Sequence, residues 1–175
     1  MHLETERLIL REMVPNDFDA LFQILSDPET MQHYPKPFDE EKVRSWIEWN
    51  RENYRVFGFG LWAVEHKEIH EVIGDCGVTM QNIGSKIKPE IGYHIRKDLW
   101  HKGYAKEASA MCRDWIFKHT PFQTMYSYMK YTNVRSYSTA ISNGMHLVDE
   151  FEDDTNTITK VYAITRRQWL ELQEG

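Results

Sequence analysis

The sequence predicts a mixed α+β fold, in which a central sheet of parallel and antiparallel strands carries helices on both faces. Stretches with strand character alternate with stretches in which apolar residues follow a helical spacing. No run rich in Pro, Gly or Ser divides the 175 residues, so we expect one domain over residues 1–175. The 41% of hydrophobic residues and 27% of charged residues are ordinary for a chain that buries a core.

The first third of the chain is expected to form one strand and two helices. Residues 8–11 have strand character, and Asn16-Asp17 supplies a helix start for a helix that ends before Asp27-Pro28. Residues 31–38 contain two prolines and form a loop. Asp39 caps a second helix, which ends at Gly58-Phe59-Gly60. Its expected buried side comprises Val43, Trp46, Ile47, Tyr54 and Phe57.

The middle of the chain is expected to form three strands followed by a helix. The strands cover residues 61–65, 72–80 and 89–96, and a polar turn over residues 66–71 joins the first two. A helix follows Gly103, because apolar residues then recur at helical spacing. Its apolar stripe comprises Tyr104, Ala108, Met111 and Trp115.

The last third is expected to add a strand, a helix and a hairpin. The strand covers residues 124–131, and Asn133 and Gly144 begin and end the helix. Residues 146–151 and 159–166 form a hairpin around Asp153-Asp154-Thr155-Asn156. Residues 167–172 add a short terminal helix. These elements complete the predicted mixed sheet.

Composition excludes several classes of protein. The formal net charge is -6 without a basic block, so we expect no nucleic-acid partner, whereas cationic amines are favoured. No run approaches the about 20 apolar residues of a membrane span, and the acidic start is unlike a signal peptide, so we expect no membrane partner. Cys76 and Cys112 lie far apart, as in a reducing compartment. We therefore expect a cytoplasmic protein.

The segment from Glu90 to Ala108 carries the chemical information. Its sequence, EIGYHIRKDLWHKGYAKEA, runs from a strand through a polar loop and a glycine into a helix. Free backbone N–H groups and the positive dipole end make such a helix start suitable for a pyrophosphate. Gly103 permits close approach of the backbone, and Lys102 and Lys106 add positive charge. The alternative is that Gly103 only begins a packed helix.

These residues resemble a known family. The segment WHKGYAKEA, residues 100–108, resembles the acyl-CoA pyrophosphate loop of GNAT N-acetyltransferases, whose pattern is Gln/Arg-x-x-Gly-x-Gly/Ala. Its form is similar to the branch that contains the ribosomal-protein-alanine N-acetyltransferases. Four further segments resemble the same branch: residues 5–11 (TERLILR), Asn133-x-x-Ser136, Asn143-Gly144-Met145, and residues 162–166 with Trp169.

The resemblance implies a GNAT fold in which two neighbouring parallel strands splay apart and acetyl-CoA lies in the wedge. It implies that backbone groups near His94, Ile95 and Arg96 pair with the pantetheine arm. It also implies cofactor contacts from the backbone amides of His101, Lys102, Gly103, Tyr104 and Ala105, and from Asn133. The expected reaction transfers an acetyl group from acetyl-CoA to a primary amine, either a protein N-terminus or a small molecule, without a metal. The fold permits a homodimer.

Three residues are candidates for proton transfer in this reaction, because the attacking amine must lose a proton. Glu90 is the first candidate base, and the alternative is a glutamate at a strand end. His94 is the second, and the alternative is a hydrogen-bonded histidine in the sheet. Ser136 is the candidate acid near the thioester, and the alternative is a serine on a helix surface.

Two departures from the family pattern leave alternatives open. His101 stands where the loop usually has Gly, although His tolerates left-handed backbone better than most residues. Ala140 stands where many members carry a tyrosine acid, which leaves Ser136, Tyr137 or water to protonate the thiolate. The missing tyrosine keeps open a non-catalytic acyl-CoA-binding or sensing module. A nucleotide-phosphate binder at Gly103 is a third interpretation.

Other residues invite functional interpretations with simpler alternatives. His33 and Tyr34 are candidates for lining the acceptor pocket, or they belong to an ordinary loop. Trp46, Trp49 and Tyr54 have the spacing of core residues. His66 and His70 have the His-x-x-x-His spacing of a metal site, but that spacing brings two rings together on a helix and not in a turn. We therefore expect no metal.

Overall fold

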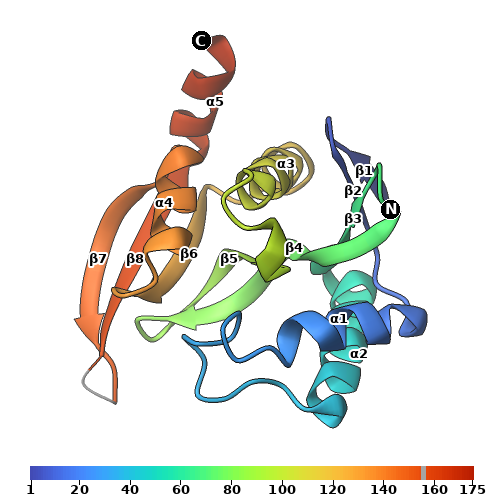
Figure 1. The fold of residues 1–175 in the computed structure, drawn as a ribbon. Helices are drawn as coiled ribbons and strands as arrows, with labels where there is room; N and C mark the ends of the chain where they lie inside the picture. The colour runs from blue at the N-terminus through green and yellow to red at the C-terminus, as the bar shows by residue number, and fades with distance from the viewer. Residues whose placement is uncertain (155–156) are drawn as a thin grey trace.

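The computed structural model describes residues 1–154 and 157–175. These residues form an eight-stranded sheet in the order β1-β2-β3-β4-β5-β6-β8-β7 (Figure 1). Neighbouring strands are antiparallel, except that β5 and β6 are parallel. The strands are β1 (His2–Glu4), β2 (Leu8–Arg11), β3 (Leu61–His66), β4 (Glu71–Ile83), β5 (Lys86–Ile95), β6 (Thr124–Lys130), β7 (His146–Glu152) and β8 (Ile158–Thr165). The mixed sheet is the one that the sequence predicts.

Helices cover both faces of this sheet, as expected. They are α1 (Phe18–Leu25), α2 (Glu40–Phe57), α3 (Tyr104–His119), α4 (Val134–Ser142) and α5 (Arg166–Glu174). Successive residues of β3 point to opposite faces. Leu61 and Ala63 pack in the core of α1 and α2, whereas Trp62 and Val64 pack in the core that includes α3. The described residues contain no helix that is long and apolar enough to cross a membrane.

The predicted helix ends are confirmed where a side chain or a glycine fixes them. The Asp39 side chain accepts a hydrogen bond from the Lys42 backbone N–H at 2.8 Å, and Gly58 ends α2 with φ +79°. Asn133 caps α4 in the same way, by accepting from the Ser136 N–H at 3.2 Å. These polar groups satisfy backbone atoms that the helix ends would otherwise leave without partners.

Some expectations about the elements were wrong. Phe57, expected to be buried, is 50% exposed, because it is the last residue of α2; its ring stacks on that of Phe59. Strand β1 was not predicted, since its three residues carry no clear alternation. Strands β4 and β5 extend further than expected, because their hairpin continues through polar residues to Ile83 and Lys86. Of the expected final turn, Thr155 and Asn156 lie outside the described residues.

The parallel pair β5–β6 is the open point of the sheet. Its register contains the single pair Glu90–Tyr126, whereas β4 and β5 are paired from Gly74–Ile95 to Ile83–Lys86. The two strands are neighbours in the middle of the sheet (Figure 1). Few hydrogen bonds therefore join the β1–β5 part of the sheet to the β6–β8 part, and this leaves room for a cleft between them.

Candidate functional site

A cleft of about 850 Å³ lies between β5 and β6, at the start of α3 and beside α4. The loop that contains His33 and Tyr34 forms a further part of its wall. The residues expected at the site that line this cleft are Glu90, His94, Ile95, His101, Gly103, Tyr104, Ala105, Asn133 and Ser136. Arg96 and Lys102 are not among the lining residues that the structure describes. The cleft is large enough for an elongated ligand.

The turn before α3 has left-handed backbone at two positions. Gly103 has φ +83° and directly precedes Tyr104, the first residue of α3. His101 has φ +62°, so it adopts the conformation that glycine usually supplies, despite its side chain. Gly103 and the first residues of α3, Tyr104 to Lys106, line the cleft. Such a helix start accommodates an anion.

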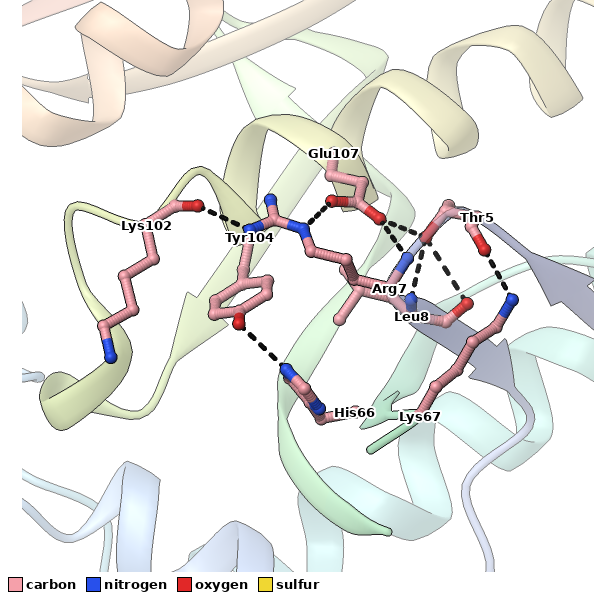
Figure 2. Close-up of polar contacts among 8 residues, drawn as sticks. All are labelled: Thr5, Arg7, Leu8, His66, Lys67, Lys102, Tyr104 and Glu107. Carbon is pink, nitrogen blue, oxygen red and sulfur yellow. Dashed lines mark hydrogen bonds and ion pairs between the residues drawn. The ribbon is translucent and has the colours of Figure 1, made fainter. Parts of the chain in front are cut away.

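A network around Arg7 holds this turn (Figure 2). The Arg7 guanidinium donates to the Lys102 carbonyl at 2.9 Å and to the Glu107 carboxylate at 2.6 Å. It also lies over the Tyr104 ring, 4.2 Å from the centroid. The other Glu107 oxygen accepts from the Arg7 N–H and from the Thr5 hydroxyl. The start of the chain is thus bound to the first turn of α3, a contact that sequence reasoning missed although it noted the segment 5–11.

His66 belongs to the same network. Its Nε2 and the Tyr104 hydroxyl are 2.8 Å apart (Figure 2). Its Nδ1 accepts from the Glu68 N–H at 3.2 Å. Both ring nitrogens therefore have partners within the chain. In the part of the chain that the structure describes, no three His, Cys, Asp or Glu side chains are grouped to hold a metal ion.

Glu90 lies in the cleft wall beside the point where β5 and β6 meet. A Cβ at Gly92 would lie 3.4 Å from Glu90 Oε1, so the absence of a side chain at Gly92 leaves space for the carboxylate. Desolvation raises the pKa of Glu90 to about 8, because the charged form loses hydration there. A carboxyl with this pKa exchanges a proton near neutral pH.

His94 lies in a chain of hydrogen bonds. Its Nδ1 is 2.7 Å from Asp75 Oδ1, and its Nε2 is 2.8 Å from the Tyr34 hydroxyl. The other oxygen of Asp75 accepts from Trp46 Nε1–H at 2.9 Å. The structure therefore brings His94 to the cleft but engages both of its ring nitrogens. Trp46, which the spacing assigns to the core, also anchors a buried carboxylate, and a sequence pattern alone does not reveal this.

Ser136 lies in the first turn of α4 and faces Tyr93 of β5. The Tyr93 hydroxyl donates to the Ser136 carbonyl at 2.9 Å and lies 3.3 Å from Ser136 Oγ. Burial raises the pKa of Tyr93 to about 12, so the phenol stays protonated. Ala140, at the position of the tyrosine acid in many GNAT proteins, is buried in the core. Tyr93 was not among the expected site residues, although it directly precedes His94.

Trp100 connects the turn to both sides of the cleft. Its Nε1–H donates to the Ile95 carbonyl at 2.7 Å, and the Arg135 guanidinium lies 3.2 Å from its ring centroid. The Arg96 N–H donates to the Ile73 carbonyl at 2.8 Å. Two of the backbone groups expected to pair with a pantetheine arm, the Ile95 carbonyl and the Arg96 N–H, therefore have partners within the chain, although the Ile95 carbonyl keeps a second lone pair.

Comparison with known proteins identifies the family. Residues 7–146 match the family model described as an acetyltransferase (GNAT) domain. The Bacillus subtilis (strain 168) protein YkkB is 36% identical over 145 residues, which cover 82% of this chain and 84% of that protein. The N-acetyltransferase p20 of Bacillus licheniformis is 37% identical over 119 residues, covering 66% of this chain and 65% of that protein.

Solved structures agree on the fold. The GNAT-family acetyltransferase from Bacillus anthracis superposes with a TM-score of 0.82 at 22% identity, covering 95% of this chain and 99% of that chain. RimL, named as a ribosomal L7/L12 α-N-protein acetyltransferase and solved with coenzyme A, superposes with a TM-score of 0.79 at 15% identity, covering 94% and 98%. The family match spans most of the chain, and the open strand pair and the glycine turn before α3 fit the coenzyme that this family uses. The chain therefore belongs to the GNAT family and is an acetyl-CoA-dependent N-acetyltransferase.

Proposed function

We propose that residues 1–175 act as one domain that acetylates a primary α-amine, either a protein N-terminus or a small molecule. The observation that carries this proposal is the position of Glu90 in the wall of the cleft, beside the point where β5 and β6 meet, where burial raises its pKa. An α-amine titrates at about 7.7–8.0 and a lysine at about 10.4. Glu90, with a pKa of about 8, is matched to the α-amine for proton transfer. The RimL name adds support by analogy alone, since that likeness concerns the fold.

Acetyl-CoA would bind along the cleft. Backbone amides from His101 to Ala105 would hold the pyrophosphate, because this turn ends at a helix N-terminus. Asn133 lines the opposite side beside the expected pantetheine arm. Of the strand groups, His94 and the Ile95 carbonyl remain candidates, whereas the Arg96 N–H already has a partner. No residue in this arrangement requires a metal.

The proposed reaction is direct attack by the amine on the thioester carbonyl. Glu90 accepts a proton from the amine nitrogen as the C–N bond forms, and a backbone N–H near Ile95 stabilises the oxyanion. The C–S bond then breaks, and the thiolate takes a proton from Ser136 or from water through Ser136. Because His94 has partners on both nitrogens, Glu90 is the better candidate for direct proton abstraction.

Thiol release from acetyl-CoA tests this function. The amines would be peptides that begin with Ala or Ser, the same peptides with an acetylated N-terminus, amino-acid amides, a polyamine and Nα-acetyl-lysine. We expect release with the free N-terminal peptides, or with small α-amines such as amino-acid amides, and none with the acetylated controls. Preference for Nα-acetyl-lysine or the polyamine would contradict the α-amine assignment. Tight binding of coenzyme A without turnover on any amine would instead indicate a non-catalytic binding module.

A further inference from the structure

In the hydrogen-bond chain Trp46–Asp75–His94–Tyr34, each donor and acceptor is fixed. This direction of donation determines whether the chain presents a donor or an acceptor to the cleft. Trp46 Nε1–H is always a donor, so one oxygen of Asp75 must accept from it. The other oxygen of Asp75 is 2.7 Å from His94 Nδ1, and a carboxylate only accepts. Neutral His94 therefore carries its proton on Nδ1.

The same logic extends to Tyr34. With the proton on Nδ1, Nε2 of His94 has a lone pair and must accept from the Tyr34 hydroxyl at 2.8 Å. The Tyr34 oxygen then keeps two lone pairs and has no hydrogen left to donate. Burial, assisted by the nearby Asp75 and Glu90 carboxylates, raises the pKa of Tyr34, so the phenol stays protonated and the direction of the chain is preserved.

Tyr34 lies in the wall of the cleft. It belongs to the loop between α1 and α2 and lines the same cleft as Glu90. Tyr34 as a whole residue is 40% exposed, while its hydroxyl is bound to His94. The ring packs edge-on against Phe38, which in turn packs against Trp46. The loop is thus bound to α2 by aromatic contacts and to β5 by the hydrogen bond.

We infer that this chain makes the Tyr34 oxygen an acceptor that binds the N–H of the incoming amine and positions it near Glu90. The inference rests on the proposed function and names a further group for its acceptor site. A primary amine or ammonium supplies the N–H donors that such an oxygen needs. Asp75 and His94 are positioning residues that act through Tyr34, whereas Trp46 only fixes which Asp75 oxygen faces it.

Variants that reverse the direction of donation in this hydrogen-bond chain test the inference. In Asp75→Asn, the donor Trp46 requires the Asn oxygen to face it, so the Asn NH₂ faces His94 Nδ1. The imidazole proton should then move to Nε2, so that Nε2–H donates to the Tyr34 oxygen and the Tyr34 hydroxyl is left to donate its hydrogen into the cleft. A comparable change of tautomer with little change in geometry is known for an Asp→Asn change behind a catalytic histidine. We expect the KM for the amine to rise about tenfold, with the KM for acetyl-CoA unchanged.

The double variant Asp75→Asn/Trp46→Phe is the matched control. Without the Trp46 donor, the Asn oxygen is free to face His94, so the Nδ1–H tautomer and a low amine KM should return. Trp46→Phe alone should keep the Nδ1–H tautomer and the low amine KM, because Asp75 still accepts from His94. Tyr34→Phe should raise the amine KM as Asp75→Asn does, whereas Tyr131→Phe, at an exposed tyrosine outside the cleft, should not.

The readouts are the amine KM with the best acceptor of the panel above and the ¹⁵N shifts of the His94 ring at a pH where it is neutral. An Nδ1–H tautomer that persists in Asp75→Asn would overturn the inference. So would an unchanged amine KM in Asp75→Asn and Tyr34→Phe while the wild type turns over. Absence of turnover in the wild type on every amine would instead be a failure of the proposed function, and the NMR readout would still test the direction of the chain.

Discussion

Gly103 faces the Arg7 guanidinium so closely that a Cβ at position 103 would lie 3.3 Å from Arg7 Nη2. The backbone there is left-handed, with φ +83°. We predict that Gly103→Ala weakens coenzyme A binding by about tenfold, because the new methyl group strains the turn and displaces the arginine that holds it. Isothermal titration of coenzyme A into the folded variant measures this.

Gly58→Ala is the control for backbone strain. Gly58 has a similar φ of +79°, and a Cβ at position 58 would meet no other atom within 4 Å among the described residues. Both variants should lose about 1 kcal/mol of unfolding free energy, since both place alanine in left-handed backbone. Equal coenzyme affinities in the two variants would show that the Gly103 turn does not hold the coenzyme.

The Glu107 carboxylate should make coenzyme binding sensitive to acid. Burial alone would raise its pKa, but hydrogen bonds from Thr5 and Arg7 outweigh burial and lower it below the ordinary 4.5. The carboxylate therefore stabilises the fold above that value, and the stabilisation is lost as pH falls through the lower folded pKa. Glu107→Gln should weaken coenzyme binding several-fold at pH 7, whereas Glu52→Gln, in an exposed pair with Arg55, should not.

The ionisation of Glu90 should determine how kcat/KM rises with pH. A general base works in its deprotonated form, so kcat/KM should increase with pH through about 8 and then level off. Glu90→Gln should lower kcat by about 10²–10⁴-fold and remove this rise. A variant that retains the wild-type profile would assign the proton transfer to another group.

The same carboxyl should destabilise the fold as pH rises. Its pKa is about 8 in the folded chain, against an ordinary value of 4.5. Between these values Glu90 ionises more readily in the unfolded chain than in the folded one. Its contribution to the free energy of unfolding is therefore complete below pH 4.5 and is lost as pH rises to about 8. Glu90→Gln should therefore raise Tm at pH 8 and leave it nearly unchanged at pH 4, as thermal scans at the two pH values would reveal.

Cys76 and Cys112 should be unreactive in the native protein. Their sulfur atoms are 3.6 Å apart in the core, and both side chains are fully buried. Burial raises the pKa of the Cys76 thiol well above its ordinary value, which suppresses the reactive thiolate. A thiol reagent should label neither cysteine in the folded protein and both in denaturant. Rapid labelling of the native chain would contradict the buried arrangement.

Local sequence signals were sufficient for most of the fold. Asp39, Gly58 and Asn133 act within a turn of their own helices, so their roles can be read from neighbouring residues. The strand–turn–helix around Gly103 is local in the same sense. Exposure was harder to predict, since Phe57 continues the apolar pattern of α2 but is half exposed at the last residue of the helix.

The contacts that organise the site join residues far apart in the chain, and spacing does not encode them. Arg7 meets Glu107 across 100 positions, and His94 meets Tyr34 across 60. The choice between Glu90 and His94 likewise depended on hydrogen-bond partners that only the folded chain provides. The residues of the motif line the cleft, whereas the roles proposed within it depend on tertiary contacts.

The single Glu90–Tyr126 pair has a consequence for handling the protein. A five-stranded block and a three-stranded block meet at this pair with little backbone bonding between them. A ligand bound between β5 and β6 would hold the two blocks together. At a free concentration [L] and a dissociation constant Kd, it would add RT ln(1 + [L]/Kd) to the unfolding free energy. The Tm of the purified protein should thus depend on how much coenzyme A remains bound after purification. Slow amide hydrogen exchange along β6 should indicate the coenzyme-bound form.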